Sequence, residues 1–252
     1  MRLNIYDTYV KIITITNIKG GTGKSTTAVH LSLSLGRKGN TLAVDMDQQG
    51  DLTEFFFPET ELEDFDKHNS YTVVKAESTL QEAVKKAQGI DVLPSVEALA
   101  NLTFQIPTNV SLVHRLRKVL RKSNYDFIVI DTPGSISPET MSSYIAADII
   151  LVPIIPAKWA IRRVRQVLDK VADAREVEGT NITRILILPM SWGKSQKHIN
   201  LLNSIREIPG LEVLEPIPFS TSIKDRTESN VILQEGKPAW IAFNNLSEEL
   251  KK

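Results

Sequence analysis

The sequence predicts an α/β fold, a doubly wound and mostly parallel β-sheet flanked by helices. Three observations support this prediction. Apolar, β-branched runs alternate with helical stretches along the chain. A glycine-rich segment joins the first such run to the first helical stretch, and two of the runs carry aspartate at or just beyond their ends. This order is typical of parallel sheets, in which ligands bind at the carboxyl ends of the strands.

Seven runs are predicted to be buried strands because they are short, rich in Val, Ile and Leu, and bounded by polar or turn residues. They cover residues 12–16, 41–45, 90–93, 126–130, 149–152, 184–188 and 211–214. After the first run, Ala28, Leu31 and Leu35 keep helical spacing, and Gly39 is predicted to end that helix.

The chain is interpreted as one domain over residues 1–252, a length sufficient for a sizeable core. Residues 1–11 mix charged and polar side chains and are expected to form an N-terminal extension. Residues 55–71 contain Pro58 and several acidic residues, and are expected to form an acidic surface excursion. No apolar run is long enough for a signal peptide or a membrane span, so a cytoplasmic protein is expected.

Composition excludes several functional classes. The formal net charge is +0 and the pI is about 6.9, so any nucleic-acid contact must come from a local basic patch. There is no cysteine, which excludes disulfides, thiolate zinc sites and cysteine-ligated iron–sulfur clusters. The four histidines, at positions 30, 68, 114 and 198, show no metal-ligand spacing.

The first predicted strand and helix are joined by a segment typical of phosphate-binding loops. It reads Lys19-Gly20-Gly21-Thr22-Gly23-Lys24-Ser25-Thr26. Glycines allow successive N–H groups to point inward, and the following helix adds the positive end of its dipole. We therefore expect these eight residues to bind a nucleoside triphosphate. Lys24 is expected to reach the β- and γ-phosphates, and the Ser25 hydroxyl to ligate Mg²⁺.

Lys19 distinguishes this loop from the standard Walker A pattern, which would have glycine where this chain has Ile18. Lys24 already serves the nucleotide of its own subunit, so Lys19 is better placed to cross into a partner subunit. With this early lysine the sequence resembles the ParA/MinD family of deviant Walker A ATPases, and most closely the ParA-type partition ATPases. The resemblance implies a homodimer that sandwiches two ATP molecules, in which Lys19 contacts the nucleotide of the neighbouring subunit.

Two aspartates, Asp45 and Asp47, close the second predicted strand and project to the same side of it. The family usually reads Asp-x-Asp-Pro-Gln-Gly here, and this chain has Gln48 in place of the proline. The resemblance implies that Asp47 positions the attacking water. Asp45 is expected to support the outer shell of the magnesium ion.

An apolar run from Phe127 to Ile130 is followed by Asp131, Thr132, Pro133 and Gly134, which has the form of a Walker B motif. Asp131 is expected to hold Mg²⁺, through water, because this ion gives up its waters reluctantly. The turn that follows is a candidate for a switch that reports the nucleotide state.

Further parts of the chain resemble the ParA family. The segment around Pro216 and Pro218 resembles the loop that encloses the base, and Pro189 and Met190 end a strand near the same place. Lys194 matches a position where many ParA proteins carry a DNA-contacting arginine, whereas the second such arginine would fall near Ser222 and is replaced or moved to Lys224. The expected DNA-binding residues are Arg162, Arg163, Lys194, Lys197, Lys224 and Arg226.

The resemblance implies an ATPase with slow intrinsic turnover whose ATP-bound dimer binds DNA without sequence preference. A ParB-like or other adaptor protein would stimulate hydrolysis and release the dimer from the nucleoid, which would position a plasmid, a chromosome region or a protein cargo. Two alternatives stay open. One is a MinD-like membrane cycler, although the C-terminal tail after Trp240 carries few basic residues for binding lipid. The other is a small-molecule ATP-dependent synthetase built on the same fold.

Overall fold

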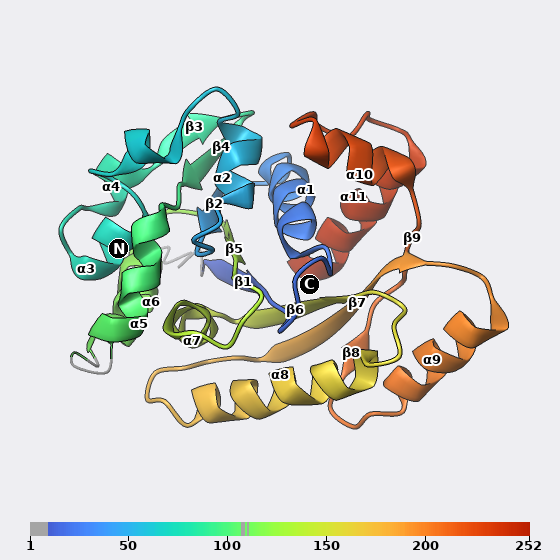
Figure 1. Ribbon diagram of the computed structural model, residues 1–252. Coiled ribbons are helices and arrows are strands. Elements are labelled where there is room, and N and C mark those ends of the chain that lie inside the picture. Colours follow the sequence, from blue (N-terminus) through green and yellow to red (C-terminus); the bar gives the residue numbers. More distant parts are fainter. Residues whose placement is uncertain (1–9, 107–108, 110) are drawn as a thin grey trace, which may run out of the picture.

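The structure is a computed structural model that describes residues 10–106, 109 and 111–252. A central β-sheet is covered by helices on both faces (Figure 1). The strand order is β3-β4-β2-β5-β1-β6-β7-β8, and β9 pairs with the end of β7. All pairings are parallel except that of β3 with β4. The predicted doubly wound, mostly parallel sheet is therefore confirmed.

The strands are short, and those in the centre of the sheet are buried. Within the described residues they are β1 (Lys11–Ile15), β2 (Thr41–Asp45), β3 (Lys85–Ala87), β4 (Ile90–Leu93), β5 (Phe127–Asp131), β6 (Ile149–Ile154), β7 (Arg184–Trp192), β8 (Glu212–Val213) and β9 (Ile217–Pro218). Each of the seven predicted strands is present; 41–45 and 90–93 match the observed bounds, and the other five differ at one or both ends by one to four residues. The sequence does not predict β3 or β9, because three residues with two lysines, or a single Ile-Pro pair, carry no apolar pattern.

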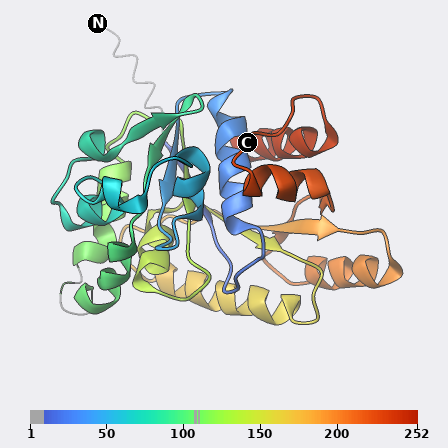
Figure 2. The same ribbon diagram turned by 45° about the horizontal axis from the view of Figure 1, so that its top comes forward.

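The helices form separate layers on the two faces (Figures 1 and 2). They are α1 (Lys24–Gly36), α2 (Asp51–Phe56), α3 (Ser70–Lys75), α4 (Leu80–Ala83), α5 (Leu102–Gln105), α6 (Ser111–Leu120), α7 (Pro138–Ala146), α8 (Ala160–Arg175), α9 (Gln196–Arg206), α10 (Thr221–Glu228) and α11 (Pro238–Lys251), with short 3₁₀ turns at Leu62–Phe65 and Glu97–Asn101. Helices α1, α2, α10 and α11 share one core with the sheet, α3 to α6 share a second, and α7 to α9 share a third.

Strand β1 shows how the sheet divides these cores. Ile13 and Ile15 pack on the side of α1, whereas Ile12 packs on the side of α6. This alternation follows from the two-residue period of a strand, and burial on both faces explains why the strand reads as an uninterrupted apolar run. The arrangement brings the loops after β1, β2 and β5 together at one edge of the sheet.

Two predicted boundaries are wrong. Helix α1 ends at Gly36 and not at Gly39, because the N–H groups of Lys38 and Gly39 both donate to the Leu35 carbonyl and close the helix there. Of the expected N-terminal extension, residues 1–9 lie outside the described residues. Lys11, its last residue, instead opens β1, and its Nζ donates to the Leu250 carbonyl at 3.1 Å.

The segment 55–71 also differs from a plain surface excursion. Phe55 and Phe56 close α2 and are buried in the core, and Phe65 is buried further along. The acidic residues between these anchors are exposed. The acidic composition therefore describes the outer side of the segment, whereas its phenylalanines hold it to the protein.

A largely buried ion pair holds the start of β1 against the residue before β6. Asp148, just before β6, accepts a hydrogen bond from the Ile12 N–H at 2.8 Å and pairs with Arg121, in the turn after α6, at 2.5 Å. The exposed fractions of these two side chains are 7% and 15%. Arg121 also donates to the Val10 carbonyl at 2.9 Å.

We predict that Asp148→Ala lowers the free energy of unfolding by about 3–5 kcal/mol, because it removes the carboxylate that neutralises the largely buried guanidinium of Arg121. Urea denaturation measures this change. Asp173→Ala is the control, since Asp173 pairs with Lys170 on the exposed surface of α8 and should cost less than about 1 kcal/mol. Equal costs for the two variants would contradict the role assigned to the Asp148 pair.

Candidate functional site

The loop between β1 and α1 has the geometry of a phosphate-binding loop. Gly21 and Gly23 have φ values of 70° and 88°, a region that L side chains rarely adopt. Gly23 is the N-cap of α1 and no side chain caps it, so the first N–H groups of the helix are left for a ligand. A cavity of about 460 Å³ opens beside this helix end. The expected loop residues that line it are Gly20, Gly21, Gly23, Lys24, Ser25 and Thr26.

The two lysines of the loop occupy different environments. Lys24 is 7% exposed, lines the cavity, and its Nζ donates to the Lys19 carbonyl at 3.5 Å. The same carbonyl accepts a hydrogen bond from the Thr22 hydroxyl at 3.3 Å. Lys19 itself is exposed. The loop thus turns one ammonium group inward to the cavity and leaves the other at the surface.

Asp131, at the end of β5, is fully buried and lies in register with Asp45 on β2. Its Oδ1 accepts a hydrogen bond from the Thr132 N–H at 3.0 Å, whereas Oδ2 has no hydrogen-bond partner among the described residues. Burial, and then the charge of Asp45, raise the pKa of Asp131 well above its ordinary value, while the nearby Ser25 hydroxyl and Lys24 ammonium lower it. An unsatisfied buried carboxylate oxygen beside a serine hydroxyl fits a hard cation such as Mg²⁺.

Asp45 differs from the metal-supporting role that the sequence predicts for it. Its Oδ1 accepts from the Asp47 N–H at 3.0 Å, and its Oδ2 accepts from the Thr53 N–H at 2.9 Å and the Thr53 hydroxyl at 2.7 Å. Burial raises the pKa of Asp45 to about 7, although these hydrogen bonds lower it. With both oxygens used in this way, Asp45 holds the loop between β2 and α2, and only its charge acts on Asp131.

Asp47 lies on that loop and lines the cavity together with Gln48 and Gln49. Its Oδ1 accepts from the Gln49 N–H at 3.1 Å, and its carbonyl accepts from the Ser95 hydroxyl at 2.6 Å. Burial raises the pKa of Asp47, whereas the charge of Lys24 lowers it. The contact with Ser95, in the turn after β4, is a site feature that sequence reasoning missed, because Ser95 and Asp47 lie on different strand ends.

The turn after β5 packs directly against the phosphate loop. Pro133, Gly134 and Ser135 line the same cavity. A Cβ added to Gly134 would lie 3.0 Å from the Gly20 nitrogen and 3.3 Å from the Lys19 carbonyl carbon. Only glycine allows this close approach. Because the two loops are in contact, a movement of one displaces the other.

A neighbouring cavity of about 360 Å³ is lined by four residues of the phosphate loop, Gly21, Thr22, Gly23 and Thr26. Met190 and Pro218, two of the residues that the resemblance predicts to lie near the base, line it. Pro189 is not among its lining residues, because alternation along β7 turns Pro189 away from the side of Met190. The sequence does not predict further lining residues, which include Ser191, Phe219, Lys224, Thr227 and Glu228.

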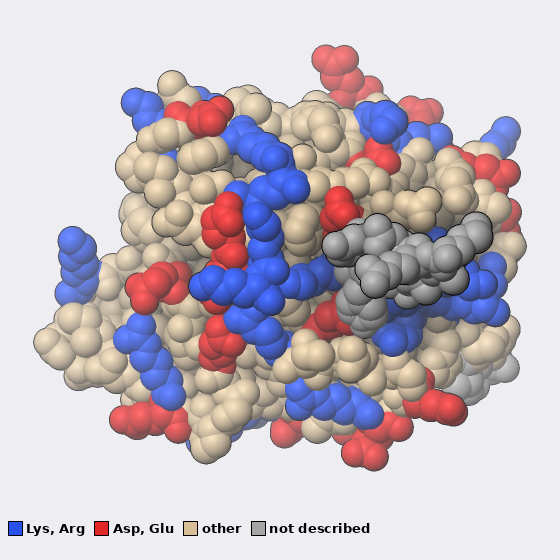
Figure 3. All heavy atoms as spheres, turned by 180° about the vertical axis from the view of Figure 1, so that it is seen from behind, with Lys and Arg blue, Asp and Glu red and all other residues tan. Residues whose placement is uncertain are grey.

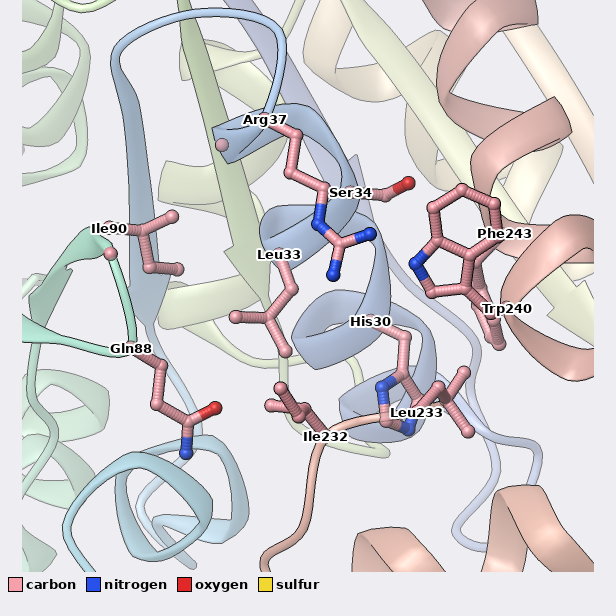
Figure 4. Close-up of a pocket in the computed structure, with 12 residues that line it drawn as sticks. His30, Leu33, Ser34, Arg37, Gln88, Ile90, Ile232, Leu233, Trp240 and Phe243 are labelled. Atoms are coloured by element: carbon pink, nitrogen blue, oxygen red, sulfur yellow. The ribbon is translucent and has the colours of Figure 1, made fainter. Parts of the chain in front are cut away.

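A smaller cavity of about 200 Å³ lies against another part of α1 (Figure 4). Arg37 stacks over Trp240 at 5.1 Å, and the floor is formed by apolar side chains with His30. His30 is bonded through Nε2 to the Thr227 hydroxyl at 2.9 Å, and burial lowers its pKa to about 3. Within the described residues, no group of three His, Cys, Asp or Glu side chains is arranged to hold a metal ion.

The six expected DNA-binding residues lie in different local environments. Arg162, Lys194, Lys197 and Lys224 are exposed, and Arg163 is partly exposed. Lys224 faces Glu228 at 3.6 Å. Arg226 donates to the Ile232 carbonyl at 2.7 Å, so it holds the loop before α11. Two of these residues lie on α8, which runs along the bottom of Figure 1, and two lie on α10. Lys194 precedes α9 and Lys197 lies in its first turn.

No single face in view is uniformly basic. From behind, Lys and Arg side chains form a band that is interrupted and flanked by Asp and Glu (Figure 3). Two arginines at the C-terminal end of α6 and in the turn after it form contacts within the fold, since Arg117 donates to the Ile145 carbonyl and Arg121 pairs with Asp148. No helix in the described part of the chain is long and apolar enough to cross a membrane.

The buried carboxylates predict a pH dependence of stability. Asp45 and Asp131 have raised pKa values in the folded state, so the folded protein holds protons that the unfolded chain releases. With Mg²⁺ removed by EDTA, we expect the free energy of unfolding to fall as the pH rises from about 5 to about 8. Asp131→Asn removes one of the two charges and should flatten this fall in urea titrations. Parallel curves for the wild type and the variant would contradict the coupling of the pair.

Solved structures share the whole fold. A putative plasmid partition protein from Borrelia burgdorferi B31 bound to AMPPNP is 24% identical, with a TM-score of 0.82, and the match covers 96% of this chain and 98% of that one. A variant of Cyanothece McdA in complex with ATP is 21% identical, with a TM-score of 0.85 and 96% of both chains covered. Cobyrinic acid a,c-diamide synthase from Mycobacterium smegmatis, with bound ADP and magnesium, is 22% identical, with a TM-score of 0.81, and the match covers 96% of this chain and 94% of that one.

Comparison of sequences identifies the family to which the chain belongs. The sporulation initiation inhibitor protein Soj of Bacillus subtilis is 32% identical over 167 residues, which cover 64% of each chain. The chromosome-partitioning ATPase Soj of Thermus thermophilus is 32% identical over 170 residues, 66% of this chain and 63% of that one. A family model described as an AAA domain matches residues 10–184. With its phosphate loop and the strand order of this fold, the chain belongs to the ParA/MinD-type ATPase family.

Proposed function

We propose that this protein is a ParA-type positioning ATPase that works as an ATP-dependent homodimer. The observation that supports the proposal most strongly is the difference in burial between the two lysines of the phosphate loop. Lys24 is buried in the cavity, whereas Lys19 is exposed, and no side-chain hydrogen bond or ion pair is formed by Lys19 within the described residues. An exposed ammonium group at the rim of a triphosphate site is suited to an anion presented by a second subunit.

Phosphoryl transfer at this site would depend on positioning and charge neutralisation. The N–H groups at the start of α1 and the Lys24 ammonium bind the phosphate oxygens of ATP. Ser25 and Asp131 are the residues that would hold Mg²⁺, which supplies charge neutralisation to the phosphates when bound. Lys19 of each subunit stabilises the negative charge in the other.

Asp47 orients the attacking water in this proposal. Its Oδ1 and its carbonyl are both held by loop contacts, so the carboxylate is fixed at the wall of the cavity. Burial raises its pKa, but Lys24 opposes that rise, and a carboxylate so placed orients water better than it removes a proton. We therefore propose slow intrinsic turnover, suited to a molecular switch.

The dimer would bind DNA through phosphate contacts made by Arg162, Arg163, Lys194, Lys197 and Lys224. Four of these side chains are exposed, so they can release counterions when they meet a phosphate backbone. Arg226 is assigned a structural role, because its guanidinium already binds the Ile232 carbonyl. In cells, this activity would keep the ATP-bound form on the nucleoid in the cytoplasm until a ParB-like adaptor stimulates hydrolysis.

The structure gives less support to the two alternative functions, a membrane-cycling ATPase and a small-molecule synthetase. The apolar side of α11 with Phe243 and Leu246 is packed into the core with α1, and Ile241 is its one exposed large aliphatic side chain, so the helix offers little apolar surface for insertion into a membrane. The fold is shared with a cobyrinic acid diamide synthase, so the fold alone does not exclude a small-molecule synthetase. The proposed role of Lys19 and the dependence of DNA binding on nucleotide distinguish the two functions.

We predict that Lys19→Ala retains ATP binding within about threefold but loses ATP-dependent dimerisation. Lys24→Ala should lose both, because Lys24 binds the phosphates of its own subunit. Fluorescent-nucleotide titration measures the first property and sedimentation velocity the second. Dimers of Lys19→Ala that form as readily as those of the wild type would refute the assignment of Lys19.

We predict that random duplex DNA is bound with ATP but not with ADP or without nucleotide, and that Asp47→Ala, which cannot orient water, keeps the ATP signal for longer. The slope of log affinity against log salt should fall by about 1 for Lys194→Ala and for Lys197→Ala. Lys67→Ala, an exposed lysine before α3, is the control and should leave the slope unchanged. Equal DNA binding in all nucleotide states would instead favour the synthetase or a passive binder.

A further inference from the structure

A large groove lies at the open edge of the sheet, where β8 meets α11. Its volume is about 720 Å³, larger than the phosphate cavity of about 460 Å³. Only Ile217 is shared with the cavity beside the base, and no residue is shared with the phosphate cavity. We call this feature the edge groove. Its location is independent of the nucleotide site on which the proposed function rests.

One wall of the edge groove is β8, the last strand of the sheet, whose outer edge pairs with no other strand in the described residues. In the described chain β8 pairs only with β7, through Glu212 with Leu186 and Val213 with Ile187. The Leu214 N–H donates to the Ile187 carbonyl at 2.9 Å. Because successive residues of a strand direct their N–H and C=O groups to opposite sides, those of Val213 are directed to the outer edge. Such an edge can accept a further strand through main-chain hydrogen bonds.

The groove is lined by apolar side chains and by acidic side chains. Leu188, Leu214 and Leu246 line it, and Ile241 of α11 is 43% exposed beside them. Three carboxylates, Glu212, Glu215 and Glu249, line the groove, and no Lys or Arg is among the lining residues.

The three carboxylates differ in their cationic partners. Arg184 approaches Glu212 at 2.6 Å and Glu249 at 3.5 Å, and Lys252 pairs with Glu249 at 2.5 Å. Glu215 is exposed and forms no ion pair within the described part of the chain. The groove therefore offers at least one carboxylate that a cation of a partner can neutralise.

We propose that the edge groove binds an extended segment of a partner protein in which apolar and basic side chains alternate. The main chain of this segment pairs with β8, its apolar side chains contact Ile241 and the apolar lining, and its basic side chains approach Glu215. A second copy of this chain fits less well, because it would bring the same glutamates against the groove. The bound segment would also contact Pro216 and Ile217, which lead directly into the base cavity at Pro218.

The test uses the whole protein and a fluorescein-labelled peptide of alternating lysine and valine, with fluorescence anisotropy as the measurement. We expect saturable binding to the wild type. Replacing every lysine of the peptide by glutamate should weaken binding by about tenfold or more. N-methylation of alternate valines, which removes main-chain donors, should weaken it by about the same factor. A dissociation constant above about 1 mM for the basic peptide would overturn the proposal.

Two matched pairs of variants locate the site. Ile241→Asp and Glu215→Lys should each weaken binding of the basic peptide by about tenfold. Their controls are Ile232→Asp, at an isoleucine that is also 43% exposed, and Glu63→Lys, at an exposed glutamate of the segment 55–71. Both controls should bind as the wild type does, and circular dichroism establishes that all four variants are folded. Unchanged binding to folded Ile241→Asp, or self-association of the wild type that this variant abolishes, would overturn the proposal.

Discussion

The site is organised by the repulsion between two buried carboxylates. The parallel pairing of β2 with β5 places Asp45 and Asp131 opposite each other, and both are fully buried. Burial raises the pKa of each, and the charge of Asp45 raises the pKa of Asp131 further. Two such charges can remain ionised together only where hydrogen bonds and cations compensate them, so the surrounding residues are arranged around this requirement.

The compensation differs for the two aspartates. Asp45 satisfies its oxygens with Asp47 and Thr53 and so becomes part of the scaffold. Asp131 keeps one buried oxygen that has no hydrogen-bond partner among the described residues, near the Ser25 hydroxyl and the Lys24 ammonium. One carboxylate therefore shapes the loop, and the other is left for a cation. This division also places Asp47, because its N–H is one of the donors that Asp45 requires.

The position of Asp47 depends on three strand ends at once. Thr53, which binds Asp45, accepts a hydrogen bond from the Ser95 N–H at 2.9 Å, and Ser95 in turn donates to the Asp47 carbonyl. The ends of β2, β4 and β5 are thereby joined in one buried network. Such a network holds the Asp47 carboxylate in place more firmly than a mobile loop would. It also connects the phosphate cavity to the segment around α3, since the Ser70 N–H donates to the Pro94 carbonyl.

The sequence by itself determined the succession of elements along the chain: the alternating strands and helices, the phosphate loop and the strands that end in aspartate. These features depend on hydrophobic periodicity, glycine and charge, which are local properties of the sequence. Only the tertiary structure decided that Asp45 supports the loop, that Pro189 faces away from the base cavity, and that Arg226 is bound to the Ile232 carbonyl. It also revealed the edge groove, whose walls lie on β8 and α11. The reason is physical, since a side chain's role depends on which hydrogen-bond partners and charges the fold brings within a few ångströms, and those partners are distant in sequence.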